Sequence, residues 1–331
     1  MLSYSELFSI LNSNSSFLIT THVNPDADAI GSEIALAGIL DQLQKEYIII
    51  NHSETPYNIQ FLDPYNIIQK FDPSIHASLF NKVEVAIFLD LNFLNRTVKM
   101  EKYFREFKGK KICIDHHTNP EGFTEFNIID QTKSATGEIL FDFISEVEEL
   151  KLNNKIALPI YAAIMTDTGS FRFSKTTPEL HNKIAELLKY DLYPEEIYDK
   201  IYSQYEFSRS LLLGKTLSTL SLSASKEICY MKVTKEMLEE TNAVESDVDG
   251  FVNFALNIKD VKVGILFFEL HDGLKISFRS KENIPINKLA EKFGGGGHLN
   301  AAGSRLFNLS LNEVIPKVIK EAEIILTNYK G

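Results

Sequence analysis

The sequence has 331 residues, of which 44% are hydrophobic and 24% are charged, and its formal net charge is −11 at pH 7. That composition is typical of a globular chain with room for two domains, and the negative charge argues against a protein that coats long duplex nucleic acid. No apolar run approaches the ~18 residues of a membrane span, and residues 1–11 lack a signal-peptide pattern. We therefore expect a cytoplasmic protein without a membrane partner, in which Cys113 and Cys229 are reduced core thiols.

Strands and helices alternate along the first half of the chain. We expect short helices and loops over 52–82, where three prolines fall and periodicity is weak. The apolar β-type runs lie at 17–20, 47–50, 83–89, 111–114 and 126–129, and the helical patterns lie at 30–43, 134–147 and 153–165. This alternation predicts an α/β domain with a parallel sheet and crossover helices on both faces.

The second half of the chain begins with mostly helical patterns over 178–220 and then returns to strands. Strands are predicted at 228–233, 261–270 and 274–280, with helices near 248–256, 286–293 and 311–326. We therefore predict a larger domain over 1–190, a helical connector over 191–218 and a smaller α/β domain over 219–331. The connector is also the expected hinge between the two domains.

The loop T-H-V-N-P-D-A-D-A-I-G-S, residues 21–32, follows the first predicted strand and leads into the first long helix. In open α/β sheets this is where ligands bind. One imidazole and two carboxylates, from His22, Asp26 and Asp28, suit a hard or borderline divalent metal ion. The alternative is an ordinary turn in which Asp28 or Ser32 caps the helix.

Three further segments carry acids or imidazoles after apolar strands or a helix. They are Asp90, the run Asp115-His116-His117, and Asp167. Any one of these acids could be a turn residue or a helix cap, but parallel strands bring their carboxyl ends to one edge, where the four segments can converge. The set is sufficient for two divalent ions that share a bridging carboxylate, and imidazoles among carboxylates favour Mn²⁺ over Ca²⁺.

These segments together resemble the four motifs of the DHH phosphoesterases. The matching stretches are the 21–32 loop, Asp90, I-D-H-H at 114–117 and T-D-T-G at 166–169. In the second half, G-G-G-H-L-N-A-A-G at 295–303 resembles the signature of the DHH-associated domain, and S-F-R-S at 277–280 its arginine-bearing strand. S-A-T-G-E at 134–138 and T-G-S-F-R-F at 169–173 are most similar to the nanoRNase/pAp phosphatase group.

The resemblance implies a role for each matching residue in the first domain. His22 and Asp26 would hold one Mn²⁺, and Asp90 would bridge both ions. The ligands of the second ion would be Asp28, His116 and Asp167. Among the catalytic residues beside Asp90, Asp115 would orient a histidine, and His117 would face the substrate phosphate.

In the second domain the resemblance implies that Arg279 and His298 bind the substrate. The glycines before the histidine, Gly295, Gly296 and Gly297, would let the backbone approach it, whereas a flexible loop is the alternative for this glycine run. The sequence departs from the family pattern at Asn92, where a small or hydroxyl residue is usual, and in having four glycines before His298. Neither departure removes a ligand.

The implied function is hydrolysis of short oligoribonucleotides to mononucleotides, of the 3′-phosphate of pAp, or of both, by water activated between two metal ions. One alternative is a phosphodiesterase of linear or cyclic dinucleotides such as pApA or c-di-AMP. Less favoured are a family II inorganic pyrophosphatase, which lacks the glycine-rich histidine motif, and a non-catalytic nucleotide-binding protein. The remaining histidines His52, His76, His181 and His271 are expected at the surface or in packing, and homodimer formation is left open.

Overall fold

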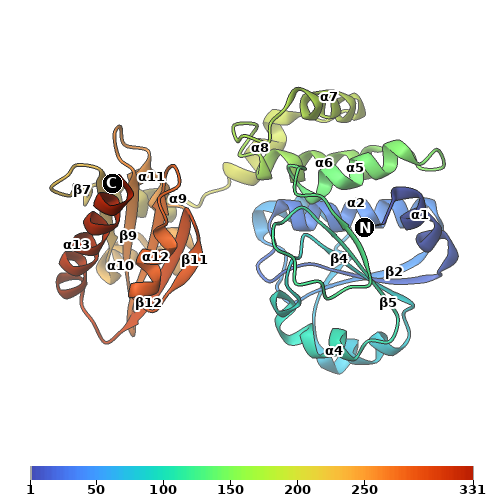
Figure 1. The fold of residues 1–331 in the computed structure, drawn as a ribbon, viewed down its shortest axis with the longest axis horizontal. Coiled ribbons are helices and arrows are strands. Elements are labelled where there is room, and N and C mark those ends of the chain that lie inside the picture. The colour runs from blue at the N-terminus through green and yellow to red at the C-terminus, as the bar shows by residue number, and fades with distance from the viewer. Residues whose placement is uncertain (1, 331) are drawn as a thin grey trace. The chain divides into compact units, whose positions relative to one another are not determined.

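The computed structural model describes residues 2–330 and divides into two compact units, the first ending at Gln204 and the second beginning at Tyr205 (Figure 1). The two helices of the predicted connector are shared between them. Helix α8 (Pro194–Tyr202) belongs to the first unit, and α9 (Phe207–Leu217) belongs to the second. The role of this segment as a hinge stays a prediction.

The first unit is built on a six-stranded sheet in the order β3-β2-β1-β4-β5-β6, and every neighbouring pair is parallel. The strands are β1 (Ser16–Thr20), β2 (Glu46–Asn51), β3 (Ile68–Lys70), β4 (Val85–Leu89), β5 (Lys110–Asp115) and β6 (Phe126–Ile129). The strand order reverses between β1 and β4. In sheets of this order, ligands bind outside the carboxyl ends of the strands at that reversal.

Helices cover both faces of this sheet, as predicted (Figure 1). One face carries α1 (Tyr4–Ser13), α2 (Ala27–Gln42), α5 (Thr136–Glu146) and α6 (Asn154–Asp167), and the other carries α4 (Glu101–Glu106) with the 3₁₀ helices η2 (Ala77–Asn81) and η3 (Leu94–Met100). Residues of β4 alternate between the two cores, since Ile87 packs on the first face and Phe88 on the second. Burial on both faces explains why the strands are almost continuously apolar in sequence.

Shorter elements complete the first unit. They are η1 (Tyr57–Leu62), α3 (Pro73–His76), α7 (Pro178–Leu187) and η4 (Leu188–Tyr190). The sequence analysis does not predict α1, although Ser3 and Glu6 form a reciprocal capping box at its start. Its apolar side is provided by only two fully buried leucines, Leu7 and Leu11, so its periodic signal is short.

The second unit is the predicted smaller α/β domain, with a mostly antiparallel sheet in the order β11-β12-β10-β9-β8-β7. Only β8 and β9 are parallel. The strands are β7 (Ser221–Leu222), β8 (Ile228–Val233), β9 (Val263–Leu270), β10 (Gly273–Ser280), β11 (Gly296–His298) and β12 (Ala301–Phe307). The sequence analysis does not predict β11 and β12. The glycine run is therefore part of a strand hairpin and not a flexible loop.

Two layers of helices cover the second sheet. One core includes α12 (Ile286–Lys292) and α13 (Leu311–Lys330), and the other includes α9, η5 (Glu245–Val248) and α11 (Val252–Leu256), with α10 (Lys235–Thr241) packed beside α9. Cys113 and Cys229 are free and buried, one in each unit, as predicted. Within residues 2–330 no helix is long and apolar enough to cross a membrane.

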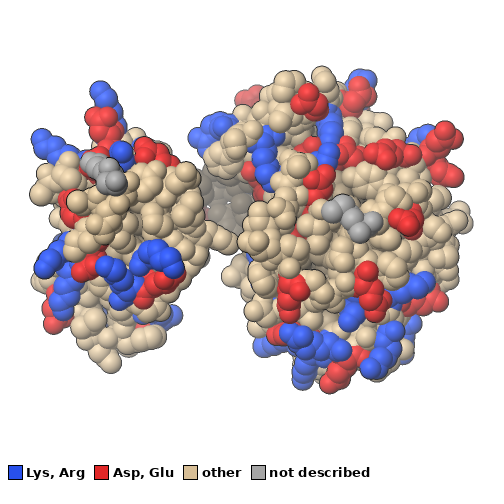
Figure 2. Space-filling model, in the orientation of Figure 1, with Lys and Arg blue, Asp and Glu red and all other residues tan. Residues whose placement is uncertain are grey.

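The charged residues are mixed in sign on the visible surface. On the face shown in Figure 2, lysine and arginine side chains alternate with aspartate and glutamate on each unit. This face therefore offers no broad, purely basic surface of the kind that binds long duplex nucleic acid through its phosphates.

Helices α2 and α6 pack closely against each other along a seam. This contact fixes the start of α2 and the end of α6, which both carry predicted ligand residues. A Cβ atom on Gly31 would lie 2.5 Å from the backbone oxygen of Pro159, a separation that side chains essentially never show. Glycine is therefore needed at position 31 by the approach of α6, and not by its own backbone conformation.

We predict that Gly31→Ala lowers the free energy of unfolding by about 1–3 kcal/mol, because the two helices must move apart. The matched control is Gly214→Ala in α9, where an added Cβ would meet nothing within 4 Å. That control should be neutral or stabilising by about 0.5–1 kcal/mol, as alanine favours a helix. Urea unfolding followed by circular dichroism measures both, and equal effects would contradict the tight seam.

Candidate metal centre

The acidic and imidazole side chains predicted from four segments converge at the carboxyl edge of the first sheet. His22 follows β1 and Asp90 follows β4, on either side of the strand-order reversal. Their side chains meet, with His22 Nε2 3.3 Å from Asp90 Oδ2, and both are buried. The backbone at Asp90 is left-handed, with φ 54°, a conformation that is uncommon outside glycine and that turns the chain sharply at the end of β4.

His116, which follows β5, lies at the centre of three carboxylates. Its Nε2 is 3.2 Å from Asp167 Oδ2, 3.4 Å from Asp90 Oδ1 and 3.6 Å from Asp28 Oδ2. The three acids come from the last residue of α6, the end of β4 and the first turn of α2. Four segments far apart in sequence thus meet at one imidazole.

The side chains form overlapping groups in which one ligand atom from each residue lies within 4.8 Å of the others. One group contains His22, Asp26 and Asp90. A second contains Asp28, His116 and Asp167, and a third joins Asp90 to His116 and His117. All six ligands predicted from the sequence are therefore brought together, with Asp90 shared between groups.

Asp26 and Asp28 are held by the start of α2. Asp26 is the N-cap residue, and its Oδ1 accepts hydrogen bonds from the backbone N–H groups of Asp28 and Ala29, each at 3.1 Å. The helix starts at Ala27, earlier than the predicted residue 30, because the cap is Asp26 and neither Asp28 nor Ser32. Capping therefore does not compete with the site but orients its first carboxylate.

Asp28 is fully buried and is held from behind by the start of α5. Its carboxylate accepts the backbone N–H groups of Thr136 at 2.7 Å and Gly137 at 2.9 Å, together with the Ser32 hydroxyl at 3.2 Å. Thr136 also donates its hydroxyl to Asp90 at 3.2 Å. The first turn of a helix is a favourable partner for an anion, so S-A-T-G-E has a clear role that sequence reasoning missed.

The protonation preferences of the cluster report a strongly negative environment. Burial, with the neighbouring charges of Asp90 and Asp167, raises the pKa of Asp28 well above its usual value. Burial alone would lower the pKa of His116, but Asp167 and Asp90 raise it to about 11. The shift at Asp28 follows first from burial and then from the neighbouring carboxylates, whereas the shift at His116 follows from carboxylates that favour positive charge between them.

Asp115 and His117 form a pair beside this cluster. Asp115 Oδ1 lies 2.7 Å from His117 Nδ1, and the same nitrogen is 3.3 Å from Asp90 Oδ1. Asp115 is fully buried, whereas the His117 side chain is about a third exposed. The predicted histidine partner of Asp115 is thus His117, whose ring is fixed through Nδ1.

Asp167 ends α6, and the chain turns away immediately after it. Gly169, Ser170 and Phe171 all have positive φ values between 58° and 63°, and the Ser170 N–H donates to the Met165 oxygen at 2.7 Å. Three successive left-handed residues cannot continue the helix. The tight turn leaves the Asp167 carboxylate at the helix end, facing His116.

The donor set passes a direct test for a divalent metal ion. The buried Nε2 and Nδ1 of His116 and the buried Oδ2 of Asp115 have no hydrogen-bond partner among the described residues. His116 Nε2 instead faces three carboxylate oxygens at 3.2–3.6 Å. Unpartnered buried donors and acceptors are rare in native proteins, and an imidazole ringed by carboxylates fits a borderline cation such as Mn²⁺.

Asn92, the departure from the family pattern, lies beside the site without entering it. Its side chain donates to the Thr118 oxygen and accepts from Arg96, each at 3.4 Å, and its backbone oxygen accepts the Glu121 N–H at 2.8 Å. Asn92 therefore links the segment after β4 to the segment after β5.

The substrate-binding residues predicted in the second unit share one face of its sheet. Arg279 on β10 pairs with Ala301 on β12, and Ala301 pairs with His298 on β11. Directly opposed residues project to the same side of a sheet, and strands lie about 4.8 Å apart, so Arg279 and His298 flank the small Ala301 at roughly 10 Å. Arg279 is half-buried and His298 exposed, and Gly295 and Gly297 allow the close approach of β11 to β12.

The other histidines lie outside the cluster. His76 is buried in packing, with its ring bonded to Gln69 at 3.0 Å and to the Asp72 N–H at 2.9 Å. His52, His181 and His271 belong to none of the groups of metal-type ligands found among the described residues.

Residues 16–164 match the DHH family, N-terminal domain, and residues 226–328 match the DHHA1 domain. The chain is 33% identical to the bifunctional oligoribonuclease and PAP phosphatase NrnA of Thermus thermophilus over 317 residues, which are 93% of this chain and 90% of the relative. This chain belongs to the DHH phosphoesterase family. The predicted family, its NrnA group, the α/β fold class and the enzyme class, a hydrolase of phosphate esters, are confirmed.

Two solved structures are similar to this DHH phosphoesterase over nearly its whole length. An exopolyphosphatase-related protein from Bacteroides fragilis is 32% identical, with a TM-score of 0.90, and the match covers 99% of this chain and 96% of that one. The exonuclease RecJ bound to manganese is 11% identical with a TM-score of 0.56, covering 97% and 94%. The second likeness is one of fold alone.

A buried network of polar groups holds the residues that precede His22 and Asp90, and it is not predicted from the sequence. Glu33, on α2 and fully buried, accepts a 2.7 Å hydrogen bond from Asn51 Nδ2, while its Oε1 has no partner. Asn51 Oδ1 in turn accepts the backbone N–H of Thr21 at 3.2 Å, and the Thr21 hydroxyl donates to the Leu89 oxygen at 2.8 Å. The network therefore fixes the residues just before His22 and Asp90.

Burial raises the pKa of Glu33 from 4.5 to about 8. The folded chain keeps this proton over a pH range in which the unfolded chain has released it, so the free energy of unfolding falls as pH rises from about 4.5 to 8. Glu33→Gln cannot release a proton. We predict that it is more stable than the native chain at pH 8, by on the order of a few kcal/mol, and that this advantage disappears near pH 4.5.

Urea unfolding at pH 4.5, 6 and 8, with a chelator throughout, measures this difference. The control is Glu54→Gln, whose side chain is 76% exposed and should give the same curve as the native chain. Parallel pH curves for the native chain and Glu33→Gln would show that Glu33 does not hold a proton in the folded state.

Proposed function

We propose that this DHH phosphoesterase is a manganese-dependent hydrolase that cleaves short oligoribonucleotides to mononucleotides and removes the 3′-phosphate of pAp. The observation that carries the proposal is the pair of three-residue ligand groups at the strand-order reversal, with Asp90 within contact distance of imidazoles from both. The similarity to NrnA of Thermus thermophilus along nearly the whole chain supports the substrate class.

In this proposal His22 and Asp26 would hold one ion, and Asp28, His116 and Asp167 would hold the second. Asp90 would contribute to both. Two divalent ions of this kind polarise a phosphoryl oxygen and lower the pKa of bound water to near neutrality. The chain contributes fixed positions for its ligands, since Asp28 is held by backbone N–H groups and Asp90 by the turn after β4.

His117 would act on the substrate phosphate. Its Nδ1 is engaged by Asp115, so the ring cannot rotate freely. With Nδ1 bound to Asp115, Nε2 is the ring nitrogen that can meet a phosphoryl oxygen, where a hydrogen bond would stabilise the charge that develops. Asp115 is then a positioning residue and not a proton acceptor.

Arg279 and His298, both in the second unit, would bind the nucleotide. The guanidinium can donate two parallel hydrogen bonds to a terminal phosphate. Ala301 between them carries only a methyl group, and the next pair on that face, Gly296 and Gly303, carries none, so the face is open to a flat ligand. The match of residues 226–328 to the DHHA1 domain supports this assignment over a pyrophosphatase with a different second domain.

The assay that tests the proposal compares hydrolysis of pAp, pApA and RNA from dinucleotides to decanucleotides with Mn²⁺. We expect turnover of pAp and of the shortest RNAs, with rates that fall as RNA lengthens. Turnover of pApA with none of pAp or short RNA would favour the dinucleotide phosphodiesterase. Hydrolysis of pyrophosphate alone would overturn the proposal.

We predict that Asp90→Ala loses both Mn²⁺ ions and nearly all activity while the fold is kept. The reason is that Asp90 contacts imidazoles of both ligand groups, so its removal takes a ligand from each ion. The matched control is Asp130→Ala, because Asp130 follows β6 at the same sheet edge but serves its own turn, accepting from Thr132. Isothermal titration with Mn²⁺ measures stoichiometry, and two ions retained by Asp90→Ala would refute the shared carboxylate.

We also predict that Arg279→Lys raises KM for pAp about tenfold or more, equivalent to ~1.4 kcal/mol, without changing Mn²⁺ binding. Lysine keeps the charge but cannot form the paired hydrogen bonds of a guanidinium. Arg305→Lys is the matched control, since Arg305 lies on the same sheet but pairs with Asp272 at the surface, where such contacts contribute little.

Bis(p-nitrophenyl) phosphate separates binding from chemistry in this experiment. This small ester needs the metal centre and little else, so Arg279→Lys should hydrolyse it at the native rate. Equal losses on the ester and on pAp would mean that Arg279 supports the catalytic centre itself. A normal KM for pAp would show that Arg279 does not bind this substrate.

A further inference from the structure

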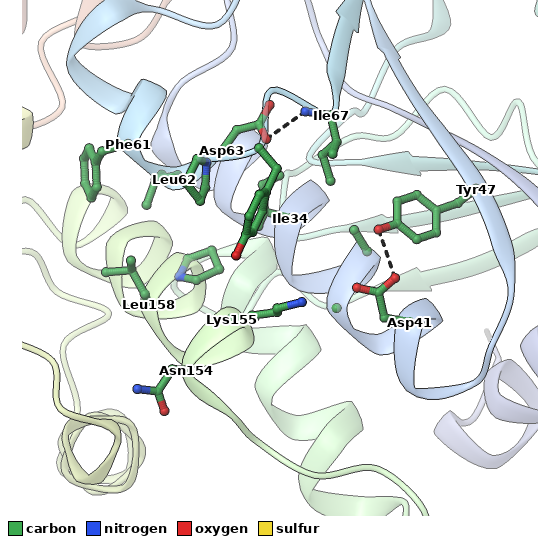
Figure 3. Close-up of a pocket in the computed structure, with 15 residues that line it drawn as sticks. Ile34, Asp41, Tyr47, Phe61, Leu62, Asp63, Ile67, Asn154, Lys155 and Leu158 are labelled. Atoms are coloured by element: carbon green, nitrogen blue, oxygen red, sulfur yellow. Dashed lines mark hydrogen bonds between the residues drawn. The ribbon is translucent and has the colours of Figure 1, made fainter.

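A pocket of about 310 Å³ lies in the first unit, away from the residues of the metal centre (Figure 3). Its walls come from α2, the first half of α6, Tyr47 of β2, and the end of η1 with the segment that follows it. The volume is at the lower end of the range for small-molecule sites, which are mostly apolar with a few placed polar groups. None of the roles proposed so far uses this pocket.

The interior of the pocket is apolar and aromatic. Ile34 and Leu158 face it from the two helices, and the rings of Tyr47, Phe61 and Tyr65 surround it. Tyr65 is 74% exposed, while Ile34, Phe61 and Leu158 are half-buried. Flat rings around an apolar space favour an aromatic ligand, which can pack face-to-edge with them.

The two carboxylates at the rim are bonded to neighbouring groups. Both oxygens of Asp63 accept backbone N–H groups at 2.9 Å, from Ile67 and Ile68. Asp41 accepts the Tyr47 hydroxyl at 3.1 Å, and burial with this neighbour raises the pKa of Tyr47 to about 12, so the hydroxyl remains a donor.

Lys155 is the cation of the pocket lining, and the two carboxylates of that lining are bonded to other groups. It extends from α6 toward α2 (Figure 3), its Nζ lies 5.8 Å from the Tyr65 ring, and no carboxylate of the described residues forms an ion pair with it. An uncommitted ammonium group at the mouth of an apolar pocket selects a ligand with an anionic end.

Two small residues of α2 line the pocket. Gly38 is needed where it is, because a Cβ there would lie 2.7 Å from Ile156 Cγ1. Ala37 is buried and also lines the pocket, so it is the position at which a larger side chain tests whether the space can be filled. Protein interiors are otherwise close-packed, and filling a cavity usually stabilises a chain.

We propose that this pocket binds a small aromatic compound with a single anionic group, its rings between α2 and α6 and its charge at Lys155, and that binding is coupled to the metal centre. The coupling follows from the two helices. Helix α2 begins at Asp26 and Asp28, and α6 ends at Asp167, while Pro159 lines both the pocket and the tight seam with Gly31. An occupant that shifts one helix against the other changes the distance between these carboxylates.

The coupling rests on the proposed metal centre, whereas the binding does not, so the two are tested separately. The probes are 1-anilinonaphthalene-8-sulfonate and N-phenyl-1-naphthylamine, which share the same rings but differ in the sulfonate. Fluorescence titration of the full chain should show saturable binding of the sulfonate at one site. Lys155→Met should weaken it about tenfold or more while leaving the neutral probe within about twofold.

Two variants that fill the pocket test its location. Ala37→Leu and Leu158→Trp should each abolish saturable binding of both probes, and the second guards against a folding defect in the first. Lys151→Met, a nearby lysine outside the pocket lining, should change nothing. Unchanged binding in both filled variants would overturn the site, and equal effects of Lys155→Met on the two probes would overturn the selection of an anion.

Isothermal titration with Mn²⁺, with and without saturating sulfonate, tests the coupling. We expect Mn²⁺ affinity to change by about fivefold or more in the native chain, within the usual range for coupled sites, and not to change in Ala37→Leu. Equal Mn²⁺ affinities in the native chain would overturn the coupling. A chain that binds no Mn²⁺ at all would refute the metal centre, while the fluorescence titrations would still decide whether the pocket binds.

Discussion

The site is organised by the burial of several carboxylates around shared imidazoles. Asp28, Asp90 and Asp115 are essentially inaccessible to solvent, and Asp167 completes the ring around His116. Bringing such charges out of water costs several kcal/mol for each ion unless nearby positive charge offsets it. The fold supplies part of this compensation through the first turn of α5, and the imidazoles supply another part. Divalent ions would supply the remainder, which links stability to the proposed chemistry.

Topology explains why these side chains can meet. A parallel sheet places all its carboxyl ends at one edge, and the order β3-β2-β1-β4-β5-β6 sends the chain in opposite directions from β1 and β4. That reversal opens the edge of the sheet at the point where His22 and Asp90 lie. The close seam of α2 and α6 then brings Asp28 and Asp167 to the same point, because one helix starts there and the other ends there.

Much of this arrangement could be predicted from the sequence. The five apolar runs of the first half correspond to β1, β2, β4, β5 and β6, and the residues after β1, β4 and β5 contribute to the cluster. The small elements were the ones missed. Strand β3 has three residues, and β11 is made of two glycines and a histidine, so neither carries an apolar signal. Helix α1 and strand β12 are also not predicted from the sequence. Strand β12 begins with the A-A-G motif, which the sequence links only to substrate binding.

The supporting interactions of the site lay further beyond the reach of sequence reasoning. Glu33 occupies a buried position of α2, but nothing in the local sequence shows that its partner is Asn51, at the end of strand β2. Thr136 and Gly137 likewise become meaningful only when α5 is placed against Asp28, 108 and 109 positions away. Long-range contacts of polar groups leave no periodic pattern, whereas the ligands themselves are marked by their place after strands.

If two metal ions share Asp90, anomalous diffraction from crystals grown with Mn²⁺ should locate both of them. The account predicts two anomalous peaks on either side of Asp90, about 3.5–4 Å apart as in two-metal hydrolases. One should lie by His22 and Asp26, and the other by Asp28, His116 and Asp167. A single peak, or peaks that do not contact Asp90, would contradict it.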